Sequence, residues 1–116
     1  MSSKILDIYP KNNKWFVSVY DSKTNANKMM LIKFSKRKGK KYDVYELKYN
    51  PETNKITPKY KLSFGSSTNQ HYFDKLEGYE ELNHNDEERR ERYYNRFKDH
   101  DGNIESAKFW SHGILW

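Results

Sequence analysis

A chain of 116 residues with a net charge of +6 is long enough for one domain, and its charge indicates a polyanionic partner. The absence of cysteine excludes disulfides and thiolate metal sites, and no apolar run is long enough to cross a membrane as a helix. Because the N-terminal residues MSSKILDIYP lack the apolar stretch of a signal peptide, we expect a soluble intracellular protein that is not secreted.

The charges are unevenly distributed along the chain. Residues 22–42 contain eight lysines and arginines and no acid, whereas residues 66–88 contain seven acids against Lys75 alone. A basic patch indicates nucleic acid or another polyanion. A basic patch together with an acidic patch also suits head-to-tail self-association. Charge by itself leaves both kinds of partner open.

Five segments have the residue patterns of β-strands. They are residues 5–9, 15–20, 28–35, 42–49 and 56–64. Pro10 is expected to end the first strand, since it cannot donate a ladder hydrogen bond. The connections are short and polar, with Gly39 free to take a positive φ and a turn cluster at residues 50–54. Such connections favour an antiparallel meander.

The clearest helix follows an irregular stretch at residues 65–83. It is predicted over residues 86–98, with Asn85 as the N-cap and Glu88 completing a capping box. One arc of this helix is aromatic and is expected to pack on the sheet. The residues of that arc are Tyr93, Tyr94 and Phe97.

An arginine stripe lies beside the aromatic arc, formed by Arg89, Arg92 and Arg96 at spacings of three and four residues. One interpretation is a solvated face with helix ion pairs, for example Glu88 with Arg92. The other is a row that binds phosphate or carboxylate groups, because the arginine fork matches such oxyanions.

The last ten residues are unusually apolar and contain Phe109, Trp110 and Trp116. We expect them to fold back into the core, the alternative being docking on a partner. Residues 106–110 are predicted to form one helical turn, with a break at Gly113.

The chain as a whole is predicted to be a single α+β domain over residues 1–116. The prediction is an antiparallel β-meander of about four to five strands followed by a C-terminal helical segment packed on one face. Residues 1–27 would form extra N-terminal strands, residues 28–65 the β-hairpins and residues 66–116 the helical part.

The basic turn after the third strand is the main candidate for a polyanion contact. Its cationic residues are Lys36, Arg37, Lys38, Lys40 and Lys41. Such side chains neutralise phosphates without reading base sequence. Phe34, Tyr42 or Tyr45 could stack on unpaired bases if they are exposed. In the alternative interpretation the lysines lie at a solvated hairpin tip and protect a sheet edge.

Two clusters resemble metal sites, namely His84 with Asp86 beside Arg89, and Asp99-His100-Asp101. The first is better explained as a helix entrance, where a carboxylate is stabilising without a metal. The second lies in a polar turn, where such residues are routine. No zinc signature, phosphate loop or nucleophile elbow is present. We therefore predict no catalytic residue, no metal ligand, no cofactor and no enzymatic activity.

Several separated pieces of sequence occur in a recognisable order. They are Lys38-Gly39-Lys40-Lys41-Tyr42-Asp43-Val44-Tyr45, Ser63-Phe64-Gly65, Tyr72 with Asp74, His84-x-Asp86-x-x-Arg89, Tyr93-x-x-Arg96, and Phe109-Trp110-Ser111 with Leu115-Trp116. This pattern resembles a family of small proteins of unknown function encoded by large nucleocytoplasmic DNA viruses, relatives of the giant viruses. Phe97 departs from it, since such proteins tend to have histidine there, and residues 1–27 lie outside it. The resemblance implies a viral protein and a virion component, and it transfers no catalytic residue.

The leading hypothesis is a non-enzymatic basic viral protein that binds nucleic acid or packages a genome through backbone phosphates. Its contacts would be the basic turn together with Arg89, Arg92 and Arg96. The alternative is a minor structural, capsid-associated protein of the virion that acts through protein–protein contacts. The weakest hypothesis is a metal-dependent nuclease using His84 and Asp86. The expected location is the virion or the viral factory in the host cytoplasm, without a membrane partner.

Overall fold

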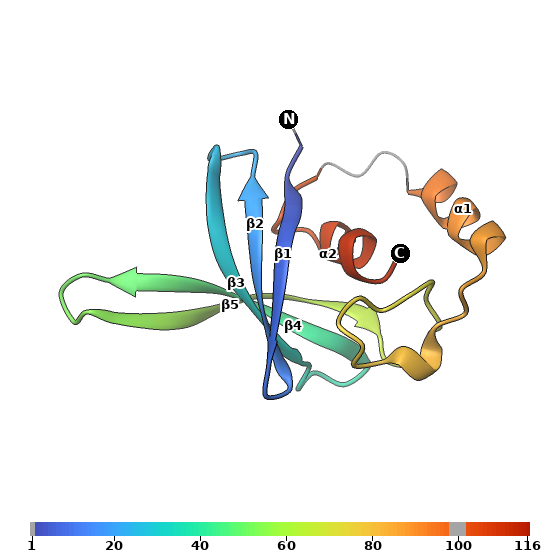
Figure 1. Cartoon of the computed structure of the whole chain (residues 1–116), viewed down its shortest axis with the longest axis horizontal. Coiled ribbons are helices and arrows are strands. Elements are labelled where there is room, and N and C mark those ends of the chain that lie inside the picture. The colour runs from blue at the N-terminus through green and yellow to red at the C-terminus, as the bar shows by residue number, and fades with distance from the viewer. Residues whose placement is uncertain (1, 98–101) are drawn as a thin grey trace.

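The computed structural model in Figure 1 describes residues 2–97 and 102–116 and contains a five-stranded antiparallel sheet. The strands are β1 (Lys4–Lys11), β2 (Lys14–Asp21), β3 (Ala26–Phe34), β4 (Lys40–Asn50) and β5 (Lys55–Ser66). They follow one another across the sheet in chain order, so the predicted antiparallel meander is confirmed.

Proline lies inside both edge strands. Pro10 is paired opposite Trp15 within β1, and Pro58 is paired opposite Leu47 within β5. The prediction that Pro10 ends the first strand is therefore wrong. An edge strand has a neighbour on one side only, so it tolerates the missing N–H of proline where a central strand would not.

The turns between the strands contain the residues that their backbone conformations demand. Asn12 and Asn13 connect β1 to β2 with φ values of 51° and 62°, a conformation that asparagine tolerates better than most residues. Gly39 has a φ of 82° before β4, which confirms the positive value predicted for it.

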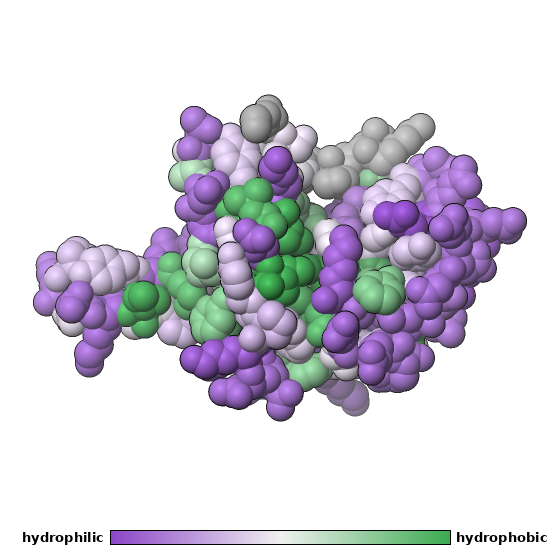
Figure 2. All heavy atoms as spheres, viewed as in Figure 1, coloured by the Kyte–Doolittle hydropathy of each residue, from purple (hydrophilic) through white to green (hydrophobic). Residues whose placement is uncertain are grey.

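The β4–β5 hairpin projects beyond the other strands (Figure 1). β3 pairs with β4 only over residues 42–46, so the outer part of the hairpin has no third strand beside it. The molecule is correspondingly elongated, with principal extents of 51 × 32 × 22 Å. Figure 2 shows hydrophobic side chains reaching the surface over β1 and β2, while the part that carries the first helix is mostly hydrophilic.

Helix α2 (Ala107–Ile114) packs on the sheet and closes the core. Ser106 caps it by accepting a hydrogen bond from the Lys108 N–H, and Trp110 and Ile114 are fully buried. The Trp110 indole N–H donates to the Ile104 carbonyl oxygen at 2.7 Å, so this large side chain leaves no unpaired polar atom in the core. The C-terminal segment therefore folds back into the core as predicted.

Gly113 does not break this helix. It lies in the last turn of α2, where an added Cβ would come within 2.5 Å of Ile5 Cδ1 on β1. The predicted break is wrong because the absence of a side chain serves close approach between α2 and β1, not a change of backbone direction.

Helix α1 (Glu87–Arg96) begins and ends differently from the prediction. Its N-cap is Asp86, whose carboxylate accepts from the Glu88 and Arg89 N–H groups, while Asn85 takes a left-handed φ of 53°. The helix ends at Arg96 with Phe97 as C-cap, and Lys98 lies outside the described residues. No residue of α1 is buried.

The aromatic arc of α1 packs on α2 and on Trp116, not on the sheet as predicted. The Tyr93 ring stacks on Trp116 with centroids 4.2 Å apart and contacts His112 at 4.9 Å. α2 already covers this part of the sheet, so α1 forms a further layer outside it.

Residues 67–86 join the sheet to α1 and contain a short 3-10 helix, η1 (Glu80–Leu82). The buried Asp74 carboxylate organises this segment by accepting hydrogen bonds from the Tyr42 hydroxyl and from the Leu76 and Tyr79 N–H groups. The Lys75 N–H donates to the Ile114 carbonyl oxygen at 3.0 Å, which ties the segment to the end of α2. No helix in the described part of the chain is both long and apolar enough to cross a membrane.

Candidate anion-binding site

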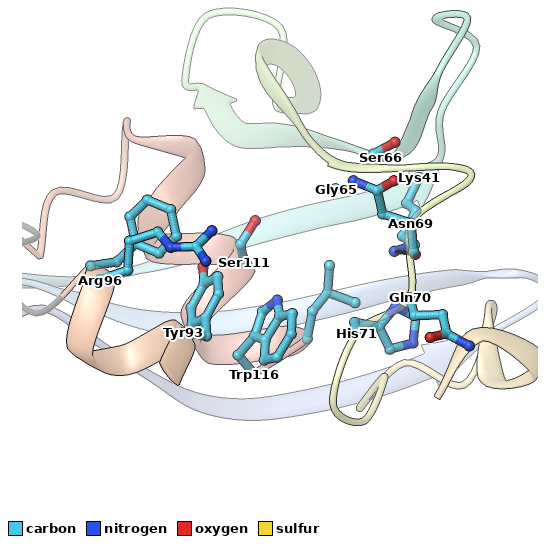
Figure 3. Close-up of a pocket in the computed structure, with 12 residues that line it drawn as sticks. Lys41, Gly65, Ser66, Asn69, Gln70, His71, Tyr93, Arg96, Ser111 and Trp116 are labelled. Carbon is cyan, nitrogen blue, oxygen red and sulfur yellow. Dashed lines mark hydrogen bonds between the residues drawn. The ribbon is translucent and has the colours of Figure 1, made fainter. Parts of the chain in front are cut away.

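A cavity of about 260 Å³ lies where β4, β5 and the segment that follows them meet α1 and the end of α2. The polar residues of its lining are Lys41, Ser66, Asn69, Gln70, His71, Tyr93, Arg96 and Ser111. Figure 3 shows Arg96 and Tyr93 on one side of the cavity and His71 on the other, with Trp116 between them. The cavity thus has room for a small polar ligand, which would lie against both cationic and neutral donors.

Lys41 supplies a buried cation to this cavity. Its side chain is only 1% exposed and packs against Gly65, where an added Cβ would lie 3.0 Å from Lys41 Cδ. The ammonium group donates one hydrogen bond, to the Asn69 carbonyl oxygen at 2.8 Å. Burial lowers the pKa of Lys41 to about 8, and the negative charges of Asp74 and Glu81 offset only part of that effect. An ammonium group has three hydrogens, so Lys41 can donate further bonds to an anion.

His71 supplies a buried, unpartnered ring nitrogen. Its side chain is 1% exposed, and Nε2 lies 2.6 Å from the Asn83 side-chain oxygen. That oxygen also accepts from the Asp74 N–H, so we assign the hydrogen of the His71 ring to Nε2. Nδ1 is then a buried acceptor without a partner among the described residues. Burial, followed by the charge of Lys41, lowers the pKa of His71 below its usual value.

The three arginines of the predicted stripe line a second cavity of about 210 Å³, together with Tyr93 and Trp116. We call this cavity the arginine groove. It shares Arg96, Tyr93 and Trp116 with the first cavity, so the two are neighbours. The Arg89 guanidinium donates to the Gln70 side-chain oxygen at 2.9 Å. Within the described part of the chain, no carboxylate lies within 4.0 Å of any of the three guanidinium groups.

The neighbouring Arg90 has a different role, which explains how α1 is held in place. Its Nε–H donates to the Trp116 carbonyl oxygen at 2.8 Å, and its guanidinium lies over the rings of Tyr72 and Tyr94. Arg90 and Tyr93 attach the helix to Trp116. The stripe of Arg89, Arg92 and Arg96 therefore faces the groove without being needed for that attachment.

The basic turn is divided by the fold. Lys36, Arg37, Lys38 and Lys40 are exposed around the β3–β4 turn, whereas Lys41 is buried in the first cavity. Arg37 lies over the Tyr60 ring, with its Cζ 4.5 Å from the centroid. The eight residues predicted to contact nucleic acid thus form an exposed turn, a buried lysine and a helical stripe, and of these eight only Lys41 and Arg96 line the first cavity.

One of the three aromatic residues considered for base stacking is not available for it. Tyr42 is fully buried among the rings of Trp15, Phe64 and Tyr79. Phe34 packs against Tyr42 and Tyr79 on one side but is 38% exposed. The alternation in β4 identified both faces of the strand, but the sequence does not show which face the C-terminal segment covers.

The histidine and aspartate before α1 serve the start of the helix. His84 Nδ1 accepts from the Asp86 N–H at 2.9 Å, and Asp86 caps the helix. Among the described residues, no group of three or more histidine or acidic side chains could hold a metal ion. The tripeptide Asp99-His100-Asp101 lies outside the described residues.

Sequence reasoning missed His71 and the cavity around Lys41. The cavity is assembled from residues far apart in sequence, and no local spacing indicates that residues 66–71 fold over Lys41. Comparison with protein-family models, with curated proteins and with solved structures finds no match to this chain.

Proposed function

We propose that this protein binds nucleic acid through backbone phosphates, and that the arginine groove makes the main contacts. The observation that carries the proposal is the groove itself. Three guanidinium groups line one cavity, and no described carboxylate pairs with any of them. A purely solvated helix face would be expected to show pairs such as Glu88 with Arg92, and none is present there.

The neighbouring cavity supports the same chemistry. A phosphate that enters the groove beside Arg96 would approach Lys41, whose ammonium group has donors to spare. Guanidinium forks bind phosphate oxygens in pairs, and a buried ammonium gains more from an anion than an exposed one does. The flat rings of Tyr93 and Trp116 line the groove and add surfaces for sugar or base contacts. We assign no catalytic residue.

The resemblance to proteins of large DNA viruses adds a biological setting to this proposal. In that setting, phosphate contacts without sequence readout would serve to condense or package a genome. The exposed residues Lys36, Arg37, Lys38 and Lys40 would add a second, weaker phosphate contact on the β3–β4 turn.

The test is a salt titration of binding to duplex DNA, single-stranded DNA and RNA. It compares the wild type with a groove variant that combines Arg89→Gln, Arg92→Gln and Arg96→Gln. Because each lost phosphate contact reduces the slope of log affinity against log salt by about one, the groove variant should lose about three units of slope. Lys41 is left unchanged, since replacing a buried side chain would confuse loss of contact with loss of fold.

The matched control combines Lys23→Gln, Lys55→Gln and Lys59→Gln, three exposed lysines outside the groove. Both variants lose the same net charge. If the two variants weaken binding equally, the groove has no special role and the proposal fails. Binding of a poly-glutamate control with the same affinity as DNA would also count against a nucleic-acid partner.

A structural role through protein–protein contacts is the alternative, and the projecting β4–β5 hairpin is the observation that favours it. Tyr49 and Ile56 are exposed on this hairpin, opposite one another in register. Self-association through the hairpin should be visible by analytical ultracentrifugation in the same salt series. Replacing Tyr49 and Ile56 by serine should then abolish association and leave any affinity for duplex DNA unchanged.

A further inference from the structure

The face of the sheet opposite α2 carries an unbroken row of large side chains. Directly paired residues in antiparallel strands point to the same face, so the register of the sheet defines this row. It crosses all five strands as Tyr9, Phe16, Leu31, Tyr45 and Tyr60. We call it the aromatic row.

The aromatic row is open to solvent at both ends. Tyr9 is 51% exposed and Tyr60 is 38% exposed, while Phe16 and Tyr45 are partly exposed between them. α2 packs on the opposite face, and no described helix covers the row. Met29, Tyr49 and Ile56 extend the exposed apolar surface on the same face. Leu31, at the centre of the row, is buried between its neighbours. Several large apolar side chains exposed on one face are typical of an interaction site.

Cations already lie over three of the four aromatic rings. Lys14 Nζ is 5.9 Å from the Phe16 centroid, Lys33 Nζ is 5.5 Å from the Tyr45 centroid, and Arg37 Cζ is 4.5 Å from the Tyr60 centroid. These positions show that the ring faces accept a cationic group from a flexible side chain, which a base could displace.

The row next to the aromatic row is basic. Lys11, Lys14 and Lys33 are paired with one another across β1, β2 and β3. The same row continues into Asp43, whose carboxylate is buried and accepts from the Ser35 and Ser63 hydroxyls and the Lys36 N–H. Burial opposes ionisation of Asp43, but these hydrogen bonds together lower its pKa below the usual value. Its charge is thus turned toward the protein, and the exposed part of the row is positive.

We infer that this open face binds single-stranded nucleic acid by stacking unpaired bases on the aromatic row, with the basic row contacting the phosphates. Every base has a π-face, so stacking requires no sequence, but it requires bases that are not already stacked in a duplex. The aromatic pairs Tyr9–Phe16 and Tyr45–Tyr60 lie on either side of Leu31 and provide two stacking positions across the sheet. Positive charges beside the rings suit a strand that carries phosphates next to its bases better than they suit an apolar protein surface.

This inference goes beyond the arginine groove and uses none of its residues. The groove lies on the helical side of the molecule and contacts phosphates of any nucleic acid. The open face would select unpaired strands. Substitutions in one site therefore leave the other intact, and the failure of either proposal is visible separately.

The experiment measures binding of oligothymidylate, oligouridylate, a duplex and an abasic oligodeoxynucleotide by fluorescence anisotropy. The test variant combines Tyr9→Ala and Tyr60→Ala. The matched control is Phe73→Ala, which removes a ring that is 43% exposed but lies outside the sheet. A second variant, Tyr9→Phe with Tyr60→Phe, keeps both rings and removes only the hydroxyls. Circular dichroism and thermal melting establish that each variant is folded.

The wild type should bind oligothymidylate and oligouridylate at least about tenfold more tightly than the abasic strand, because the abasic strand offers phosphates without bases. The alanine variant should lose at least about tenfold in affinity for both oligonucleotides, while Phe73→Ala and the phenylalanine variant should match the wild type. Duplex binding should not change in any of them.

Three results would overturn the inference. One is equal affinity of the wild type for the abasic strand and for oligothymidylate. Another is unchanged oligonucleotide affinity in a folded alanine variant. The third is a wild type that forms a dimer while the alanine variant is a monomer, if oligothymidylate does not dissociate the wild-type dimer. A second copy of the chain would then cover the aromatic row.

Discussion

Both faces of the sheet carry tyrosine side chains, but the tyrosine on one face is buried and the tyrosine on the other face is partly exposed. Tyr42 and Tyr45 lie three positions apart in β4. The Tyr42 ring contacts Trp15, Phe64 and Tyr79, and burial with a hydrogen bond to Asp74 raises the pKa of its hydroxyl well above the usual value. The Tyr45 ring contacts only Tyr60 among the aromatic residues described, with Lys33 above it.

The cations show the same contrast. Lys41 is buried beneath residues 66–71 and donates to a backbone carbonyl, whereas Lys33 lies on the open face over a ring. Residue type alone therefore does not separate structural residues from ligand-binding ones in this protein. The covering layer formed by residues 67–97 and 102–116 makes that separation. Substitutions beneath the layer should change stability, and substitutions on the open face should change binding.

The largest effect is expected for Trp110→Ala beneath the covering layer. Trp110 is fully buried in α2, stacks on Phe64 and donates its indole N–H to the Ile104 carbonyl oxygen. The substitution removes a large side chain and leaves a cavity, so the free energy of unfolding should fall by about 3–5 kcal/mol. Urea denaturation followed by fluorescence or circular dichroism measures it. A loss below about 1 kcal/mol would mean that α2 does not close the core as described.

The next effect is a pH dependence caused by Lys41. Its pKa is lowered to about 8 in the folded protein, from 10.5 for an exposed lysine. Between pH 8 and pH 10.5, Lys41 binds more protons in the unfolded chain than in the folded protein. The free energy of unfolding therefore increases as the pH rises through this range. Compared with Lys41→Met, the wild type should gain up to about 3 kcal/mol between pH 8 and pH 10.5.

Measuring the difference between wild type and variant cancels the contribution of other groups, including Lys75, whose pKa burial also lowers. Lys55→Met, at an exposed position on the β4–β5 hairpin, is the control and should follow the wild type at every pH. Parallel stability curves for the wild type and Lys41→Met would show that Lys41 is not buried as a cation.

The strand pattern was predictable because it is local. Alternation within residues 15–20 and 42–49 reflects the period of a strand, and Gly39 and the asparagine-rich turns fix the connections. The aromatic row was not predictable in the same way. It depends on the register of four strand pairs, and that register shifts at irregularities between Ile5 and Asp7 and between Val44 and Tyr45.

The arginine stripe was predictable from helical spacing, because all three residues belong to one helix. The burial of Lys41 was not, because five cations in one turn look alike in sequence. What distinguishes Lys41 is the fold of residues 66–71, which is held by long-range bonds such as the Ser67 N–H to the Gly39 carbonyl oxygen. The His71 site likewise depends on Asn83, which reaches it through the isolated bridge between the two residues.

A smaller effect is expected when one hydroxyl is removed beneath the covering layer. Tyr42→Phe keeps the ring among its aromatic neighbours but takes away the hydroxyl that donates to the buried Asp74 carboxylate. Asp74 would keep its two backbone donors and lose its third, so the free energy of unfolding should fall by about 1–3 kcal/mol. Urea denaturation at neutral pH measures the change. A variant as stable as the wild type would show that the hydrogen bond at Asp74 contributes nothing net.

The smallest effect is expected from the same chemical change on the open face. Tyr60→Phe removes a hydroxyl that lies 2.8 Å from the Ser63 hydroxyl at an exposed position, where water replaces the lost bond. The free energy of unfolding should therefore change by no more than about 0.5 kcal/mol. Because Tyr42→Phe and Tyr60→Phe delete the same atom, the difference between them measures the contribution of the covering layer directly. If the two variants lose equal stability, something covers the open face in the folded protein, and the contrast between the two faces is wrong.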